Sequence, residues 1–194
     1  MILPILAYGD PILKKPTKEV DKDHPNLDGL IEDMFETMYA ASGVGLAAPQ
    51  IGESLRLFIV DATPFGEDTD DPDALKVKDF KQVFINAEII EKGGEPWPFE
   101  EGCLSIPNIR EEVVRDEVIK IRYYDADWNL KEEEFDGYAA RIIQHEYDHI
   151  EGVLFTDKLN PLKRRMLKRK LNEISMGTTK VDYKMRFPKL KIKR

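Results

Sequence analysis

Residues 136–152 read DGYAARIIQHEYDHIEG and hold two of the three histidines of this 194-residue chain. His145 and His149 are four residues apart, so on a helix they project from one face, with Cβ atoms roughly 5–6 Å apart. The pattern predicts a helix over 136–152, with Gly152 as the residue that follows its C-terminus. Two histidines so placed can bind one metal ion, and the alternative is a solvated pair on an acidic helix.

Hydrophobic periodicity predicts further elements on both sides of this helix. Apolar residues recur at helical spacing in 25–43, which predicts a second helix that ends at Gly43. The segment 63–76 is rich in Pro, Gly and Asp and is predicted to be a loop. Strands are predicted over 55–62, 82–93, 111–127 and 130–135. This order favours an α+β fold, with antiparallel or mixed sheets packed around the helix that carries the two histidines.

The charge of the chain is unevenly distributed. Residues 158–194 contain 14 Lys and Arg but 2 Asp and Glu, whereas residues 1–157 contain 15 basic and 35 acidic residues. We therefore expect a catalytic domain over 1–157, followed by a basic C-terminal helix and tail over 158–194 that is not an independent domain. An acidic body with a basic tail favours contact between the tail and a polyanion.

A helix is predicted over 160–175, with Asn160 as N-cap and Pro161 at the first helical position. Its apolar stripe is predicted to pack on the body, and it comprises Leu162, Met166, Leu167, Leu171 and Ile174. Apolar and polar residues alternate over 181–187, which is the period of a strand, so this end is expected to pair with a sheet edge or to stay mobile.

The composition excludes several classes of protein. A hydrophobic content of 42% is enough for a core, and the single cysteine, Cys103, excludes an internal disulfide. No apolar run approaches the ~18 residues that span a bilayer. Asp10 comes too early for a secretory signal peptide. We expect a cytoplasmic protein with no membrane partner.

The two histidines leave a metal ion short of protein ligands. Catalytic metal sites usually have three protein ligands and one open position, so a third ligand is needed. His24 lies in a polar stretch and is expected at the surface. The candidates are Cys103, in EEGCLSIP (100–107), or a carboxylate. Glu146 directly follows the first histidine and can act on a water molecule without being a ligand.

A second stretch, SGVGLAAPQIG (42–52), contains three glycines, two alanines and a glutamine after a predicted helix. Small residues let the backbone approach a ligand closely, and the alternative is a loop that only ends the helix. The glycines lack the spacing of a dinucleotide-binding motif and follow a helix rather than a strand.

Three motifs together resemble those of peptide deformylases: GVGLAAPQ (43–50), EGCLS (101–105) and HEYDH (145–149). The stretch ILPILAYGDPILKKP (2–16) is also similar to the N-terminus of that family, and the resemblance covers roughly residues 2–160. It implies removal of the N-formyl group from the initiator methionine of nascent peptides, with release of formate.

The resemblance also implies a role for each motif residue. One divalent metal, Fe²⁺ in the cell and Zn²⁺, Ni²⁺ or Co²⁺ in some preparations, would be bound by Cys103, His145 and His149. Glu146 would be the general base and acid. Gln50 and the backbone N–H of Leu104 would stabilise the formyl oxygen as negative charge builds on it.

The methionine side chain of such a substrate needs an apolar pocket near the metal. Ile142 lies three residues before His145 and shares its helical face, although it could instead only pack the core. The residues expected around the pocket are Val44, Gly45, Leu46, Gly102 and Ile142.

Two other functions fit part of the pattern. HExxH also occurs in zinc endopeptidases, but Cys103 in EGCLS and the absence of a further downstream histidine argue against one. A basic-tailed RNA- or ribosome-binding protein with a structural metal would need a fourth protein ligand. The expected partners are formylated nascent peptides and, through residues 158–194, the ribosome surface, but not DNA. Deleting the residues after Asp157 is expected to spare activity on a short peptide, if the fold survives, and to weaken ribosome binding.

Overall fold

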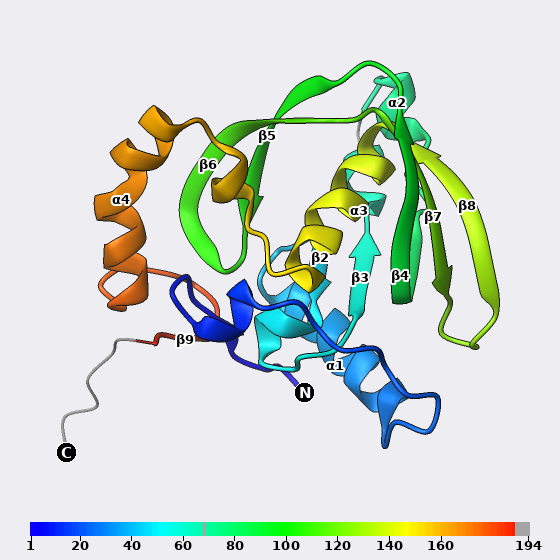
Figure 1. Cartoon of the computed structure of the whole chain (residues 1–194), viewed down its shortest axis with the longest axis horizontal. Helices are drawn as coiled ribbons and strands as arrows, with labels where there is room; N and C mark the ends of the chain where they lie inside the picture. The colour runs from blue at the N-terminus through cyan, green and yellow to red at the C-terminus, as the bar shows by residue number, and fades with distance from the viewer. Residues whose placement is uncertain (68, 189–194) are drawn as a thin grey trace.

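The computed structural model describes residues 1–67 and 69–188, and it shows the predicted α+β fold (Figure 1). No helix in these two ranges is both long and apolar enough to cross a membrane. In chain order the strands and helices are β1 (Ile5–Leu6), α1 (Leu27–Ala40), β2 (Gly45–Ala47), β3 (Leu57–Asp61), α2 (Pro72–Leu75), β4 (Lys81–Gly93), β5 (Trp97–Cys103), β6 (Ile106–Arg115), β7 (Val118–Tyr124), β8 (Leu130–Asp136), α3 (Gly137–Ile150), α4 (Pro161–Ser175) and β9 (Met185–Arg186). Short 3₁₀ helices lie at Pro11–Lys14, Ala48–Ile51, Thr63–Gly66 and Phe155–Lys158.

The main sheet has five antiparallel strands in the order β2-β3-β4-β7-β8. Strand β3 is buried along its whole length, and its side chains alternate between the two faces of the sheet. Phe58 and Val60 pack in one apolar cluster with the helix α3, whereas Leu57 and Ile59 pack in another with α1. The sheet is therefore covered by a helix on each face.

Helix α3 lies between the main sheet and the β5–β6 hairpin (Figure 1). Because it is covered on both sides, ten of its residues are buried, including His145, Glu146 and His149. The helix ends at Ile150, and Gly152 adopts a left-handed φ of 73°, as predicted for the residue that follows the helix. A Cβ at Gly152 would collide with the backbone of Lys14 and Lys15, so this glycine also allows a close approach of two chain segments.

Some predicted boundaries were wrong. Helix α1 ends at Ala40, before Gly43, and the left-handed residue after it is Ser42, with a φ of 54°. The single strand predicted over 111–127 is two strands, since β6 pairs with β5 while β7 pairs with β4 and β8. The chain changes sheet at the polar residues between them, and hydrophobic period alone does not reveal that change.

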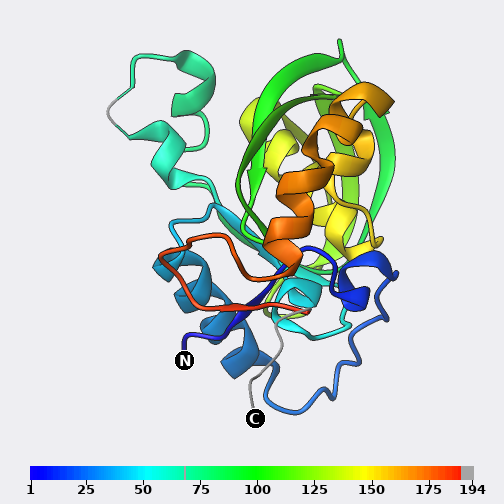
Figure 2. The same ribbon diagram turned by 90° about the vertical axis from the view of Figure 1, so that its left-hand side faces the viewer.

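Helix α4 lies across the outer side of the β5–β6 hairpin (Figure 2). It begins as predicted, because the Asn160 side chain accepts a hydrogen bond of 2.9 Å from the Lys163 N–H. The predicted apolar stripe is only partly correct, since Leu162 and Met166 are 68% and 73% exposed. The buried face contacts residues of β1 and β6 and consists of Leu167, Leu171, Ile174 and Ser175.

This packing changes the expectation for a deletion after Asp157. Leu167, Leu171 and Ile174 belong to the same buried cluster as Leu6 and Ile106. A deletion would expose that cluster to water, so the fold is not expected to survive it. Substitutions on the exposed face of α4 are the better test of a ribosome contact.

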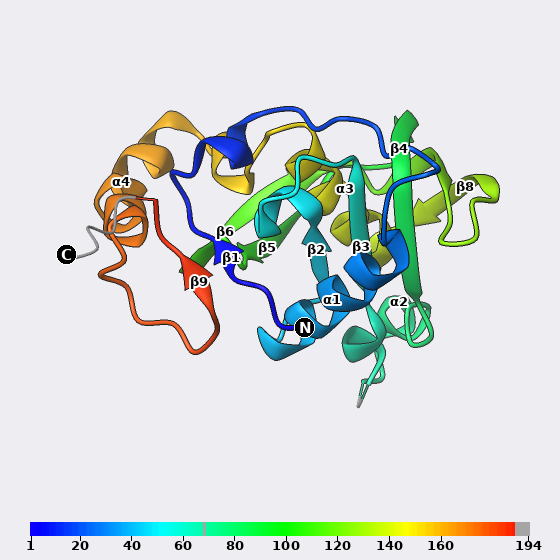
Figure 3. The ribbon, with the colours of Figure 1, turned by 90° about the horizontal axis from the view of Figure 1, so that it is seen from below.

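Beyond α4, the chain returns to β1 (Figure 3). Met185–Arg186 pair in parallel with Ile5–Leu6, so this short piece of the 181–187 segment does pair with another strand. Residues 189–194 of the predicted basic tail lie outside the described residues.

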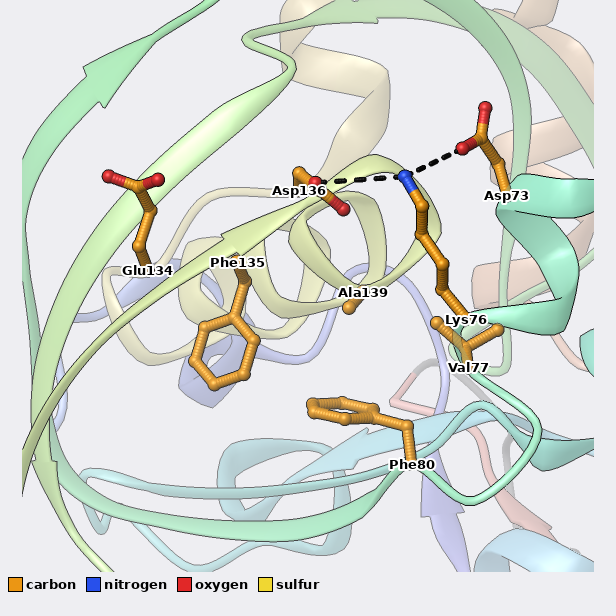
Figure 4. A pocket seen from close by; sticks show the side chains of 8 residues that line it. All are labelled: Asp73, Lys76, Val77, Phe80, Glu134, Phe135, Asp136 and Ala139. Carbon is orange, nitrogen blue, oxygen red and sulfur yellow. Dashed lines mark ion pairs between the residues drawn. The ribbon is translucent and has the colours of Figure 1, made fainter.

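The segment 63–76 is not only a loop, because it contains a 3₁₀ helix at Thr63–Gly66 and the short helix α2. A small pocket of about 210 Å³ lies between α2 and the end of β8 (Figure 4). At its rim the Lys76 ammonium lies 2.8 Å from the Asp73 carboxylate and 3.8 Å from that of Asp136. All three side chains are exposed, so these ion pairs contribute little to stability.

Candidate active site

Helix α3 carries both predicted metal-binding histidines on one buried face. The His145 and His149 rings lie one turn apart, with centroids separated by 5.2 Å. They are 9% and 1% exposed, and burial lowers the pKa of His149. A neutral imidazole is the form that binds a metal ion, and the lowered pKa favours it at His149, whereas at His145 burial is outweighed by the hydrogen bonds with Cys103 and Glu101, which raise the pKa.

Cys103 is the last residue of β5, and the hairpin brings it against this face of α3. Its Sγ lies 3.2 Å from the His149 Nε2. One ligand atom from each of Cys103, His145 and His149 lies within 4.8 Å of the others. Of the alternatives left open by the sequence, the cysteine is the one whose ligand atom groups with those of both histidines. His24 is half-buried and is not part of this group.

The donor set fits a single divalent transition metal. A thiolate and two imidazole nitrogens are typical ligands of Zn²⁺ and Fe²⁺, and three protein ligands leave a coordination position open. His145 Nδ1 lies 2.9 Å from the Glu101 carboxylate, which leaves its Nε2 for the site. A carboxylate behind a histidine ligand orients the ring and is common at metal sites.

Glu101 is a residue of the candidate site that the sequence did not single out, and it contacts His145. Its buried carboxylate accepts hydrogen bonds of 2.6 and 2.8 Å from Arg115 and of 3.0 Å from Arg141. Burial alone would raise the pKa of Glu101, but the hydrogen bonds from Arg115 and His145 outweigh it and hold the pKa well below its usual range. Its spacing from Cys103 was the available signal, because residues 101 and 103 of a regular strand project to the same side, although the register of β5 shifts between Gly102 and Cys103.

Glu146 is buried beside His145 and is 4% exposed. Burial raises its pKa to about 7, and its Oε2 has no hydrogen-bond partner in the described part of the chain. A Cβ at Gly45 would collide with this carboxylate, so the glycine of β2 is what gives Glu146 its space. A carboxyl group with a pKa near neutrality can both accept and return a proton.

Gln50 closes the site from the side of the main sheet. It lies in the 3₁₀ helix Ala48–Ile51 and is 1% exposed. Its Oε1 accepts a hydrogen bond of 2.8 Å from the Ala47 N–H, which fixes the orientation of the amide. Its Nε2 therefore points to the Cys103 Sγ at 3.5 Å and to the Ser105 Oγ at 3.2 Å.

These groups border a cavity of about 830 Å³, a volume within the range of small-molecule sites. Of the predicted site residues, those that line it are Val44, Gly45, Gln50, Gly102, Cys103, Leu104, Ile142, His145 and Glu146. His149 lies deeper. The side chain of Leu46 does not line the cavity, contrary to expectation, because strand alternation turns it into the cluster with α1.

A family model described as polypeptide deformylase matches residues 2–165 of the chain. A peptide deformylase of Christiangramia forsetii is 56% identical over 193 residues, which cover 98% of each chain. The chain belongs to the polypeptide deformylase family. A second relative, a peptide deformylase of Flavobacterium psychrophilum, is 55% identical over 96% of this chain and 97% of that protein. The crystal structure of a peptide deformylase from Legionella pneumophila has a TM-score of 0.76 and 42% identity, and the match covers 89% of this chain and 95% of that one.

Membership in this family identifies the chain as a hydrolase of protein biosynthesis and as a metalloenzyme. It confirms the resemblance seen in the three motifs, and the geometry now places those motifs around one cavity. It also decides against the zinc endopeptidase and against a non-enzymatic RNA-binding protein, since the relatives are enzymes of a different reaction.

Proposed function

We propose that the cavity beside α3 is the active site, where Cys103, His145 and His149 hold one divalent metal ion. The reaction removes the N-formyl group from the initiator methionine of nascent peptides and releases formate. The observation that carries this proposal is the cluster itself: three ligand atoms within 4.8 Å of one another, at the wall of a cavity of about 830 Å³.

When bound, the metal ion supplies Lewis acidity to a water molecule and to the formyl carbonyl. Glu146 accepts a proton from the attacking water and returns it to the amine of the leaving methionine. Its burial, which raises its pKa to about 7, suits both steps. Glu101 acts through His145, since it holds the ring in the orientation that a ligand needs.

Charge develops on the formyl oxygen as the carbonyl carbon becomes tetrahedral. We assign Gln50 Nε2 and the Leu104 N–H as its donors, because both groups border the cavity next to Cys103. Each such donor typically contributes ~2.7–4 kcal/mol to the transition state. An amide and a peptide N–H donate without adding a charge that would have to be desolvated.

The substrate side chain is assigned to the part of the cavity near α3 and β2. Val44, Gly45, Gly102 and Ile142 line it, and Leu46 can take part only through its backbone. Ile142 also packs in the apolar cluster of α3 and the sheet, so it serves both the core and the pocket.

Formate release from a formyl-methionyl peptide tests the activity. The same sample is incubated with an unformylated peptide to detect cleavage of internal bonds. Formate release without internal cleavage is expected. Internal cleavage without formate release would contradict the proposed activity.

Fe²⁺ is our assignment for the metal in the cell. A thiolate ligand makes the site soft enough for Fe²⁺ or Zn²⁺ and unsuited to Mg²⁺ or Ca²⁺. A ferrous ion bound to a thiolate is open to oxidation. Peroxide is therefore expected to inactivate the ferrous form faster than the Ni²⁺ form, and equal sensitivity would contradict an iron site.

The exposed face of α4 is assigned to contact with the ribosome surface, in the cytoplasm where formylated chains are made. Cations cover this face, and Arg164, Arg165, Lys168 and Lys170 are all exposed. A docked enzyme would meet its substrate at a high effective concentration as the chain emerges.

A further inference from the structure

The segment that follows α4 returns to the active-site cavity. Lys180, Val181, Asp182 and Tyr183 all line the cavity of about 830 Å³. The segment is held at both ends: the Asn108 side chain donates a hydrogen bond of 2.9 Å to the Lys180 carbonyl, and Met185–Arg186 pair with β1. It is therefore a fixed wall of the cavity, although it follows α4 in the sequence.

Tyr183 connects this wall to the metal-binding hairpin. Its hydroxyl donates a hydrogen bond of 2.7 Å to the backbone carbonyl of Leu104. The two side chains also pack against the same apolar cluster, next to α1. Leu104 directly follows Cys103, so Tyr183 contacts the neighbour of a proposed metal ligand and the residue whose N–H is a proposed oxyanion donor.

The conformation of this part of the hairpin is not determined by its own sequence. Cys103 pairs with Ile106 around a turn at Leu104 and Ser105, but the register shifts between Gly102, which pairs with Arg110, and Cys103, so this turn is offset from the regular ladder of β5 and β6. Turns of this length usually require a positive φ in at least one central residue, because other types splay the strands. Neither Leu104 nor Ser105 has a positive φ. The turn is therefore not of the types that a short hairpin favours by itself, and contacts from other segments support it.

Three hydrogen bonds from distant segments hold the turn. The Gln50 amide donates to the Ser105 hydroxyl at 3.2 Å, and the Tyr8 N–H donates to the Ser105 carbonyl at 2.8 Å. The third is the bond from Tyr183 to Leu104. Tyr183 belongs to the segment beyond α4 and lies 79 residues from Leu104 in the sequence.

We propose that residues 180–183 complete the active site: the segment forms one wall of the substrate cavity, and Tyr183 is a positioning residue that fixes the Leu104–Ser105 turn. This inference rests on the proposed roles of Cys103 and Leu104. Tyr183 does not act on the substrate itself. It restricts the peptide units on which the Cys103 thiolate and the Leu104 N–H depend, so its effect appears in turnover.

Tyr183→Phe tests the positioning role, because it removes the hydroxyl and keeps the ring. We expect kcat for a formyl-methionyl peptide to fall about 3- to 10-fold, as expected for loss of one hydrogen bond, with little change in KM. Amide hydrogen exchange in the Cys103–Ile106 turn is expected to become faster. The matched control is Tyr124→Phe, since Tyr124 packs against the same cluster but does not line the cavity.

Val181→Trp tests the wall, because a larger side chain would narrow the cavity. We expect KM to rise about 10-fold with kcat nearly unchanged, the reverse of the Tyr183→Phe result. The control is Val114→Trp, since Val114 is 60% exposed on β6 and does not line the cavity.

The outcomes separate this inference from the proposed function. If the wild-type protein releases formate but Tyr183→Phe has unchanged kcat and unchanged exchange in the turn, the positioning role is wrong while the function stands. An unchanged KM in Val181→Trp would likewise mean that residues 180–183 do not border the space that the substrate occupies. If the wild-type protein loaded with a divalent metal releases no formate, the proposed function itself fails.

Discussion

Charged residues are arranged differently around α3 and along α4. Around α3, the buried Glu101 carboxylate accepts hydrogen bonds from the buried guanidinium groups of Arg115 and Arg141. Along α4 most of the cations are exposed, and the ion pair of Arg169 with Glu173 forms at a side chain that is 90% exposed. A buried charge is costly unless it is paired, whereas an exposed pair contributes little. The buried charges around α3 therefore fix the positions of the side chains at the site, whereas the exposed charges of α4 remain available to a partner.

The largest effect is expected for Glu146→Gln, at the centre of the buried region. Glutamine keeps the shape of the side chain but cannot accept a proton from water. We expect kcat to fall about 10²- to 10⁴-fold, the usual contribution of a general acid–base group, with metal content unchanged. Near-normal turnover with metal retained would remove Glu146 from the mechanism.

Glu101→Gln tests whether the Glu101 carboxylate holds the buried Arg115 and Arg141 side chains and the His145 ring in place. The substitution leaves the Arg141 guanidinium without a carboxylate partner and Arg115 with Asp148 as its remaining one, which is expected to cost about 3–5 kcal/mol of unfolding free energy. It also weakens the support of His145, so metal affinity should fall about 10- to 100-fold. Denaturant unfolding and metal titration measure the two effects. Wild-type stability would mean that Glu101 is not the centre of the network.

Two leucines of α4 compare the buried and exposed faces of one helix. Leu171 is 7% exposed and Leu162 is 68% exposed. Leu171→Ala is expected to cost about 2–5 kcal/mol of unfolding free energy, because it leaves a cavity in the cluster with β6. Leu162→Ala should stay within about 0.5 kcal/mol of the wild type. Similar losses for both would mean that the whole predicted stripe is buried in solution.

The smallest effect on the fold is expected for charge reversal on α4. Arg164→Glu with Lys168→Glu should change stability by no more than about 0.5 kcal/mol. Activity on a short formyl-methionyl peptide should be unchanged. Co-sedimentation with ribosomes should weaken, and wild-type binding should fall steeply with added salt as phosphates regain counterions. The control is Lys92→Glu, an exposed lysine of β4. Full ribosome binding by the double variant would mean that the exposed face of α4 does not contact the ribosome.

The local parts of the site could be predicted from the sequence. The spacing of His145 and His149 places them on one helical face, and the caps of α4 follow from Asn160 and Pro161. The fold class followed from the order of periodic segments. These features depend on residues within a few positions of one another, which is the range over which a sequence pattern carries structural information.

The long-range pairings could not be predicted in this way. Glu101 meets Arg115 and Arg141 across 14 and 40 residues, and Tyr183 meets Leu104 across 79. Leu162 and Met166 match the helical period but remain exposed, whereas Leu167, Leu171 and Ile174 pack in the cluster with β6. Which residues face each other depends on how the hairpin and the helices pack, and the hydrophobic period of one segment contains no information about that packing.

Metal content and formate release, measured on the same anaerobically purified sample, test the central claim most directly. The account predicts one divalent metal ion per chain, with activity proportional to metal content, and loss of both in Cys103→Ser. Serine is a harder and weaker ligand than a thiolate, so the variant should bind Fe²⁺ poorly. Full formate release by metal-free protein, or unchanged metal binding in Cys103→Ser, would contradict a metal centre formed by Cys103, His145 and His149.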